Sequence, residues 1–525
     1  MRMKSLFLAI VTFICLCCSN ILYAQYYYDT SIKNNYVDQN IFINRQSNDE
    51  QLPQYDAIKT KLPEPYWPAR KDVIACYWKA WELAFVNVKE ATKENGFKMP
   101  YISPAFNNHL FMWDTSFMVM FGRYGKNAFN FQGSMDNFYA RQHKDGYVCR
   151  EIAEQNGAEI FEKYDPSSTG PNIMPWAEWD YFQYYKDRKR LEEVFPVLLA
   201  YYQWFQANRS WMDGSYYSSG WGCGMDNQPR VQPGYHLEFT HAFMSWIDTN
   251  LQQIFAGKVL VKMAEVLNRK KDVQNIENEV ISLTDYVQGK MWDANTGYFY
   301  DRFKDGSLSN VKSIASYWAL LADVVPENGR REFIAHLENP DEFARLHRVP
   351  TLSADTKGYS PDGNYWRGGV WAPTSYMVLR GLSVYKEDSL AYEIALNHLN
   401  NVVKVFTKTG TLWENYAPDL VEGKYRKDLV GWTGLVPISV LFEYIFGISA
   451  DREKDVLVWD VRLLDEFGIK KYPLKNNGLA EFWCAKRKKN TDKPKIKVKS
   501  TIPLTVKLIW NGGTEMIKIK PGADK

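Results

Sequence analysis

The chain has 525 residues and a formal net charge of +3, from 64 Lys and Arg against 61 Asp and Glu. A hydrophobic share of 46% and a charged share of 24% are those of an ordinary globular protein, which excludes a disordered chain and a polytopic membrane protein; the near-neutral charge gives no reason to expect a nucleic-acid partner. Aromatic residues make up 15% of the chain, enough either to fill a large core or to line a groove for sugar rings.

The first 24 residues have the pattern of a secretory signal peptide. A cationic start precedes an apolar run at residues 6–18, and Leu22-Tyr23-Ala24 resembles a small-residue cleavage site. The run is too short for a transmembrane helix, which needs about 20 apolar residues. We therefore expect a secreted, periplasmic protein with no membrane span. The alternative is a lipoprotein signal, in which Cys18 would carry a lipid anchor.

Residues 25–70 predict an extended N-terminal lead-in, because they are rich in Tyr, Asn, Gln and Pro and lack helical periodicity. Helical patterning starts near residue 71. Ile74, Trp78, Trp81 and Phe85 recur on one face of a predicted helix, and such a face is more typical of core than of a ligand surface.

Helical patterns continue to about residue 448, including residues 252–288 and 436–447. Long segments rich in Gly, Pro, Asn and aromatic residues join them, and loops of that length inside a compact domain are usually functional. Residues 71–448 therefore predict one large, mainly α-helical domain.

Residues 449–525 predict a small β-rich C-terminal module. Residues 455–459 have strand composition, and residues 505–510 and 516–519 flank Asn511-Gly512-Gly513 as in a hairpin. The Lys and Arg run at residues 486–499 could suggest an anionic partner, but alternating Lys more often protects an edge strand against aggregation.

Four cysteines follow the signal, at Cys76, Cys149, Cys223 and Cys484. They show no CxxC spacing, which argues against a zinc site and favours buried free thiols, although an oxidising compartment leaves one disulfide open. The seven histidines show no metal-binding spacing, and no EF-hand pattern is present. The sequence therefore predicts no metal and no organic cofactor, with bound calcium left open.

Five loop segments combine an acidic or amide side chain with Trp or Tyr. They are residues 112–117 (MWDTSF), 220–230 (GWGCGMDNQPR), 359–371 (YSPDGNYWRGGVW), 412–416 (LWENY) and 431–435 (GWTGL). Aromatic rings can stack on sugar faces while polar groups bind the hydroxyls, as in typical small-ligand pockets. Glycoside hydrolysis needs two carboxyl groups that flank the bond, which Asp226 and Glu414 could supply.

Each residue also has an ordinary structural interpretation. Asp114 could cap a helix that begins at Thr115, and Asp226 and Asp362 could stabilise turns. Glu414 could be a buried, paired acid, and Arg367 could bind a carboxylate within the core.

In this order, the five motifs resemble a clan of inverting glycosidases that includes family 63 α-glucosidases, family 37 trehalases and bacterial mannosylglycerate hydrolases. The resemblance covers roughly residues 71–448. It implies an (α/α)6 barrel with the active site at the mouth, where the long loops gather. It also implies an inverting, exo-acting glycoside hydrolase that cleaves an α-glucoside or related oligosaccharide.

The resemblance implies a role for each matching residue. Asp226 matches the general acid and Glu414 the general base. Substrate-binding positions match Trp113, Asp114, Trp366, Arg367, Tyr416 and Trp432. The segment before Met225 departs from the family pattern, and so does the one at residues 172–179. Both departures bear on substrate identity rather than on the chemistry.

Two other functions remain open at this point. One is a non-catalytic glycan-binding protein on the same fold, against which the presence of both carboxyl groups argues. The other is a polysaccharide lyase, which would use Tyr, His or Arg beside an acidic sugar. The sequence does not identify the sugar, the linkage, the substrate length or the oligomeric state.

Overall fold

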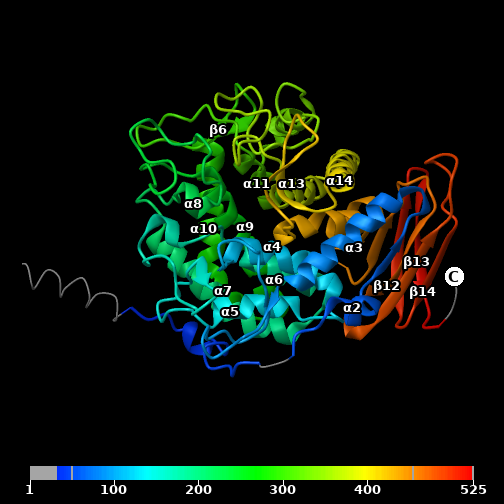
Figure 1. Cartoon of the computed structure of the whole chain (residues 1–525). Coiled ribbons are helices and arrows are strands. Elements are labelled where there is room, and N and C mark those ends of the chain that lie inside the picture. Colours follow the sequence, from blue (N-terminus) through cyan, green and yellow to red (C-terminus); the bar gives the residue numbers. More distant parts are fainter. Residues whose placement is uncertain (1–31, 49–50, 452–453, 523–525) are drawn as a thin grey trace, which may run out of the picture.

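The computed structural model describes residues 32–48, 51–451 and 454–522, and the predicted signal peptide with Cys18 lies outside these residues. The described chain is mainly helical, as the sequence predicts (Figure 1). Among these residues, no helix is both long and apolar enough to cross a membrane. The α-helices are α2 (Tyr55–Ile58), α3 (Lys71–Val86), α4 (Met112–Gly122), α5 (Asp136–Tyr139), α6 (Met174–Tyr185), α7 (Arg188–Asn208), α8 (Gly220–Cys223), α9 (Ile247–Leu267), α10 (Gln274–Lys290), α11 (Trp318–Ala322), α12 (Arg330–Ala335), α13 (Ala372–Val384) and α14 (Asp388–Thr409).

The helices pack in a closed order. α4 contacts α6, α6 contacts α9, α9 contacts α11, and α11 contacts α13. α13 then contacts the 3-10 helix η11 (Gly431–Leu435), which contacts α4 again. Further helices pack against this ring: α7 against α6 and α9, α10 against α9, and α14 against α13. η11 continues into a π-helix, η12 (Val436–Ile445), which packs against α3 and α14.

Helix α3 shows how the aromatic residues are used. Trp81 and Phe85 are buried as predicted, whereas Ile74 and Trp78 are only partly buried. The fully buried stripe instead includes Tyr77, one residue before Trp78. This face belongs to the core, so the prediction of a structural rather than a ligand-binding face is confirmed.

Within the described residues, one strand near the N-terminus and seven strands after η12 form two four-stranded sheets. Their orders are β1-β12-β13-β14 and β10-β11-β15-β16. Figure 1 shows the C-terminal strands, in orange and red, to one side of the helices. The bounds are β1 (Glu64–Tyr66), β10 (Ile448–Ala450), β11 (Leu457–Asp460), β12 (Phe467–Pro473), β13 (Leu479–Cys484), β14 (Ile496–Ser500), β15 (Leu504–Trp510) and β16 (Gly513–Ile519).

The predicted hairpin is confirmed by β15 and β16, which pair antiparallel with Trp510 opposite Gly513. β11 pairs with β15 in parallel. β1 comes from the predicted lead-in and pairs with β12, so this segment is not merely extended but completes a C-terminal sheet. Short two-stranded ribbons lie between the helices: β2 (Val88–Lys89) with β3 (Tyr101–Ile102), β4 (His109–Phe111) with β5 (Glu151–Ala153), β6 (Trp292–Asp293) with β7 (Tyr298–Phe299), and β8 (Trp413–Tyr416) with β9 (Gly423–Lys427).

The cysteines of the described chain are free thiols. Cys76, Cys149, Cys223 and Cys484 are all buried, as their spacing in the sequence indicates. Burial raises the pKa of the Cys76 and Cys223 thiols, so both stay protonated at neutral pH.

Candidate active site

A pocket of about 310 Å³ lies among segments that begin or immediately precede the ring helices. Trp113 is in the first turn of α4, Pro171 precedes α6, Trp366 precedes α13, and Trp432 is in η11. The predicted residues that line this one pocket are Trp113, Asp114, Asp226, Trp366, Glu414 and Trp432. The fold thus brings together six of the eight residues that the motifs indicate.

Stacked and edge-on indole rings form the inner wall. Trp366 stacks on Trp371 with ring centroids 3.9 Å apart and an interplanar angle of 2°. Trp113 stacks on Trp366 at 5.7 Å, and Trp432 meets Trp113 edge-on at 5.5 Å. Within the described part of the chain, the buried Nε1 atoms of Trp113, Trp366 and Trp432 have no hydrogen-bond partner. The wall is therefore built largely from indole rings, and its three N–H groups are donors that no acceptor of the described chain takes up.

Asp226 is held by the turn that follows α8. Ser219 caps this helix, with its Oγ accepting a hydrogen bond from the Gly222 N–H at 3.0 Å. Gly224 ends the helix with a φ of +80°, and a Cβ there would fall 2.0 Å from Cζ3 of Trp113. Glycine is required at this position on both counts, and the close approach sets Asp226 beside the tryptophan wall.

Asn227 connects the loop that carries Asp226 to the segment that carries Trp366. Its Oδ1 accepts a hydrogen bond from the Trp366 N–H at 2.9 Å, and its Nδ2 donates to the Asn364 carbonyl at 2.9 Å. Gln228 continues the attachment, because its Nε2 donates to the Thr351 carbonyl at 2.6 Å. Both residues belong to a sequence motif, but nothing in the motif itself indicates this bridging role.

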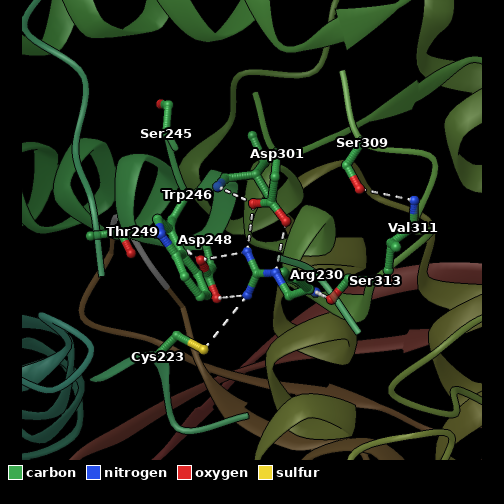
Figure 2. A network of polar contacts seen from close by, with 12 residues as sticks. Cys223, Arg230, Ser245, Trp246, Asp248, Thr249, Asp301, Ser309, Val311 and Ser313 are labelled. Atoms are coloured by element: carbon green, nitrogen blue, oxygen red, sulfur yellow. Dashed lines mark hydrogen bonds and ion pairs between the residues drawn. The ribbon is translucent and has the colours of Figure 1, made fainter. Parts of the chain in front are cut away.

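Arg230 anchors the same loop in the core (Figure 2). Its guanidinium donates two hydrogen bonds to Asp248, at 2.7 and 2.9 Å, and two to Asp301, at 2.8 and 2.7 Å. Trp246 covers the guanidinium, 4.7 Å from its ring centroid. All three charged side chains are almost fully buried. Such bidentate pairs fix geometry, so the loop ahead of Arg230 has little freedom to move.

Glu414 lies on β8 and is 4% exposed. β8 pairs with β9, and Tyr416 exchanges two backbone hydrogen bonds with Val370, at 2.8 and 3.0 Å. The Tyr365 hydroxyl lies 3.4 Å from Oε1 of Glu414 and donates to it. A strand fixed on both sides therefore positions the second carboxyl group from a different part of the chain than the first.

Both carboxyl groups have raised pKa values. Burial raises the pKa of Asp226 to about 7; Arg150 opposes this shift, while the charges of Glu238 and Glu414 add to it. Burial also raises the pKa of Glu414 to about 7, against the lowering effect of Arg426 and Tyr365. At neutral pH, one of the two groups can hold a proton while the other is ionised, which is the requirement for paired acid and base chemistry.

Asp114 is not the cap of a helix, in contrast to its structural interpretation from the sequence. α4 begins at Met112, with Phe111 at the cap position, so Asp114 lies in the first turn and lines the pocket. Burial raises its pKa well above the usual range, and Glu414 adds to the shift. The N-cap hypothesis is therefore wrong, and Asp114 is available to a ligand as a hydrogen-bonding group.

Arg367 and Tyr416 do not line the pocket, in contrast to their expected contact with substrate. The Arg367 Nε donates to the Asn227 carbonyl at 3.1 Å, behind the acid's loop. Tyr416 is 1% exposed and packs beside His347, at 5.8 Å between ring centroids. Both residues lie behind the walls: Arg367 follows Trp366, which lines the cavity, and Tyr416 is two residues beyond Glu414 on β8.

Arg150 is a pocket residue that the motifs did not indicate. Its Nε donates to the Ser167 carbonyl at 2.6 Å, and Nη2 lies 3.2 Å from Oε2 of Glu151. A lone arginine in an ordinary stretch of sequence carries no local signal, so only the fold reveals it. Among the described residues, no group of His, Cys, Asp or Glu side chains is arranged to hold a metal ion.

Comparison with known proteins connects this pocket to a family. The mannosylglycerate hydrolase MGH1-like glycoside hydrolase domain matches residues 107–428, which include Asp226 and Glu414. An uncharacterized protein of Borreliella burgdorferi is 26% identical over 367 residues, 67% of this chain and 75% of that protein. A probable mannosyl-oligosaccharide glucosidase of Schizosaccharomyces pombe is 23% identical over 288 residues, 48% of this chain but only 34% of that protein.

The crystal structure of the family 63 mannosylglycerate hydrolase from Thermus thermophilus in complex with glucose has a similar fold. The TM-score is 0.57 at 18% identity, over 69% of this chain and 99% of that one. The resemblance indicated by the five motifs is thereby confirmed. With more than half of its length matched by the family, the chain belongs to the MGH1-like glycoside hydrolases and is a glycoside hydrolase.

Proposed function

We propose that this enzyme is an inverting, exo-acting glycosidase that removes a terminal sugar from an α-glucoside or a related oligosaccharide. The observation that carries the proposal is the pair Asp226 and Glu414: both line one tryptophan-walled pocket, and both have a pKa of about 7. A single displacement needs one carboxyl group that is protonated and a second that is ionised at the same pH, and a pair with pKa values of about 7 meets this need near neutral pH.

In this mechanism, protonated Asp226 donates its proton to the glycosidic oxygen as the bond to the anomeric carbon breaks. Ionised Glu414 takes a proton from a water molecule, whose oxygen attacks the anomeric carbon from the opposite face. The products are the free sugar with inverted configuration and the released alcohol. Inverting enzymes hold such carboxyl groups about 6.5–9.5 Å apart to leave room for the water.

The size and walls of the pocket support removal of one sugar from a chain end. A volume of about 310 Å³ is at the lower end of the range of about 300–1,000 Å³ for small-ligand sites. Trp113, Trp366 and Trp432 form the wall, and Asp114 adds a polar group within reach of a sugar hydroxyl.

We also propose that the ring of helices is an (α/α)6 barrel. The closed order of contacts from α4 through α6, α9, α11 and α13 to η11, with other helices packed outside it, supports this architecture. The pocket would then occupy the barrel mouth, because its residues begin or precede the ring helices.

The apolar run at residues 6–18 supports export to the periplasm, with a lipid anchor at Cys18 as the alternative. The division into a lead-in, a helical domain over residues 71–448 and a C-terminal module is also part of the proposal. β1 qualifies it, because the lead-in contributes a strand to the C-terminal module.

The test is the configuration of the first sugar released. Purified protein would be screened against di- and trisaccharides with α-linked glucose or mannose at the non-reducing end. Hydrolysis of a hit would then be followed by ¹H NMR before mutarotation. We expect the β-anomer from an α-linked substrate. Release of the α-anomer would overturn the single displacement, and an internal cut would overturn exo action.

A further inference from the structure

An aromatic surface continues from the pocket mouth onto the loop at residues 231–244. Trp221 lines the pocket, and the Phe239 ring meets it edge-on with centroids 4.4 Å apart. His236 stacks on Phe239 at 4.3 Å with an interplanar angle of 17°. We call Trp221, Phe239 and His236 the aromatic ledge. Phe239 is 43% exposed and His236 is exposed too, so part of the aromatic surface of the ledge is open to solvent.

The ledge is attached to the loop that carries Asp226. The Trp221 N–H donates to the Glu238 carbonyl at 3.0 Å. A Cβ on Gly220 would fall 2.5 Å from the Leu237 carbonyl oxygen and 2.8 Å from that of Asp226, so both backbones touch this glycine. The ledge is therefore on the proton donor's side of the pocket.

Hydrogen bonds within the loop hold the ledge in place. The Glu238 N–H donates to Nδ1 of His236 at 3.3 Å, and Oγ1 of Thr240 donates to the His236 carbonyl at 3.0 Å. These bonds keep His236 over Phe239 without a ligand. A surface ordered in advance loses less conformational entropy when it binds.

The proposed reaction determines which part of the substrate lies on this side of the pocket. The general acid protonates the oxygen of the leaving group, so the part of the substrate that departs must extend past Asp226. Exposed ring faces that continue from a pocket mark a binding surface. Within an oligosaccharide, the leaving group is itself a chain of sugar rings, whose apolar faces fit such a surface.

We propose that the aromatic ledge binds the leaving-group end of an oligosaccharide, with the first sugar beyond the cleaved bond on Trp221 and the second on Phe239 and His236. The enzyme is thereby adapted to substrates of at least three sugar units rather than to disaccharides. This inference rests on the proposed function and deepens it, because it assigns a substrate length.

The experiment compares substrates that share the same terminal sugar and linkage but have two or three units. We expect kcat/KM of the native enzyme to be about three- to tenfold higher for the trisaccharide, the gain that one or two aromatic contacts supply. In a His236→Ala/Phe239→Ala variant, the ratio of the two kcat/KM values should fall towards one, mainly through a higher KM for the trisaccharide. Both side chains are exposed, so the fold should tolerate the changes.

Phe243→Ala is the matched control. Phe243 is on the same loop and 46% exposed, but its ring contacts Trp211, His241 and Tyr235 rather than the ledge. It should keep the native ratio. The ledge proposal would be overturned if the native enzyme had equal kcat/KM values for the two substrates, or if the double variant kept the ratio of the native enzyme. Either result would leave the proposed function intact. If the native enzyme hydrolyses no glycoside in the collection, the proposed function fails, and the ledge proposal fails with it.

Discussion

Gly224 and Trp113 approach so closely that a Cβ on the glycine would lie 2.0 Å from the indole ring. The contact joins the turn that carries Asp226 to the first turn of α4, which carries Asp114. The position of Asp226, the proposed proton donor, relative to the tryptophan wall therefore depends on the absence of one methyl group.

Replacing Gly224 by Ala should reduce kcat/KM by more than about tenfold, because the added methyl must displace either Trp113 or the acid's turn, and displacements on the ångström scale are costly in catalysis. Gly214→Ala is the control: Gly214 has a φ of +82°, but a Cβ added there would meet nothing within 4 Å. Both variants share the backbone strain, so equal activities would show that the contact with Trp113 is unimportant.

Asp226→Asn and Glu414→Gln should each lower kcat by at least about 10²–10⁴-fold, the usual contribution of a general acid or base. Circular dichroism should remain native, since both changes keep the side-chain shape. Asp362→Asn alters an exposed carboxylate in a neighbouring motif and should retain activity. Near-normal turnover in either pocket variant would remove that residue from the mechanism.

The dependence of kcat/KM on pH should be bell-shaped with a maximum near pH 7. The active form has one proton on the pair, and both carboxyl groups have pKa values of about 7. Glu238→Gln should move the alkaline limb to lower pH, because the Glu238 charge helps to raise the pKa of Asp226. Initial rates from pH 4.5 to 9.5 would measure this, and an alkaline limb that does not respond would contradict the assignment of Asp226 as the acid.

Stability should also respond to these carboxyl groups. The folded-state pKa of Asp226 is raised from 3.8 to about 7, so folding favours the protonated form. Its stabilising effect is fully present below pH 4 and is lost as the pH rises through about 7. Asp226→Asn should therefore gain stability relative to the native protein between pH 4 and pH 8, by about 1–2 kcal/mol once partial exposure is considered. Urea unfolding at both pH values would show it, and a constant difference would contradict the raised pKa.

Arg230→Met should lower the free energy of unfolding by about 3–5 kcal/mol, because it leaves Asp248 and Asp301 buried without a cation. It should also reduce activity by loosening the acid's loop. Arg188→Met removes an exposed pair with Glu192 and should cost less than about 1 kcal/mol. Similar losses in the two variants, measured by denaturant unfolding, would contradict the anchoring role of Arg230.

The loop motifs predicted much of the pocket, because the residues needed there are locally unusual. Asp226 follows a glycine-rich turn, and Glu414 lies between Trp413 and Asn415. Arg367 and Tyr416 have the same signature, yet neither lines the cavity. Trp366 faces it in place of its neighbour Arg367, and the register of β8 shifts between Trp413 and Asn415, so Glu414 and Tyr416 do not follow regular strand alternation. A motif thus identifies a segment of the site more securely than it identifies each side chain.

Contacts between distant segments could not be predicted from the sequence. Arg230 was visible in its motif, but its partners Asp248 and Asp301 are in ordinary contexts that carry no local signal. The helical periodicity identified α3 but chose Trp78 for its buried face, whereas Tyr77 is the fully buried residue. Tyr77 and Trp78 are both aromatic, and they precede Trp81 by four and three residues, spacings that each place a side chain on the same helix face.

The pairing of β1 with β12 has a consequence for how the protein is made. Trp67, next to β1, donates a hydrogen bond to Asp465, which is 398 residues further along. A growing chain must release nearly its whole length before this sheet can close, and connections of such long range form late and slowly. During synthesis, Glu64–Tyr66 would therefore wait without its partner strand, a short edge whose Pro65 limits unwanted pairing with other nascent chains.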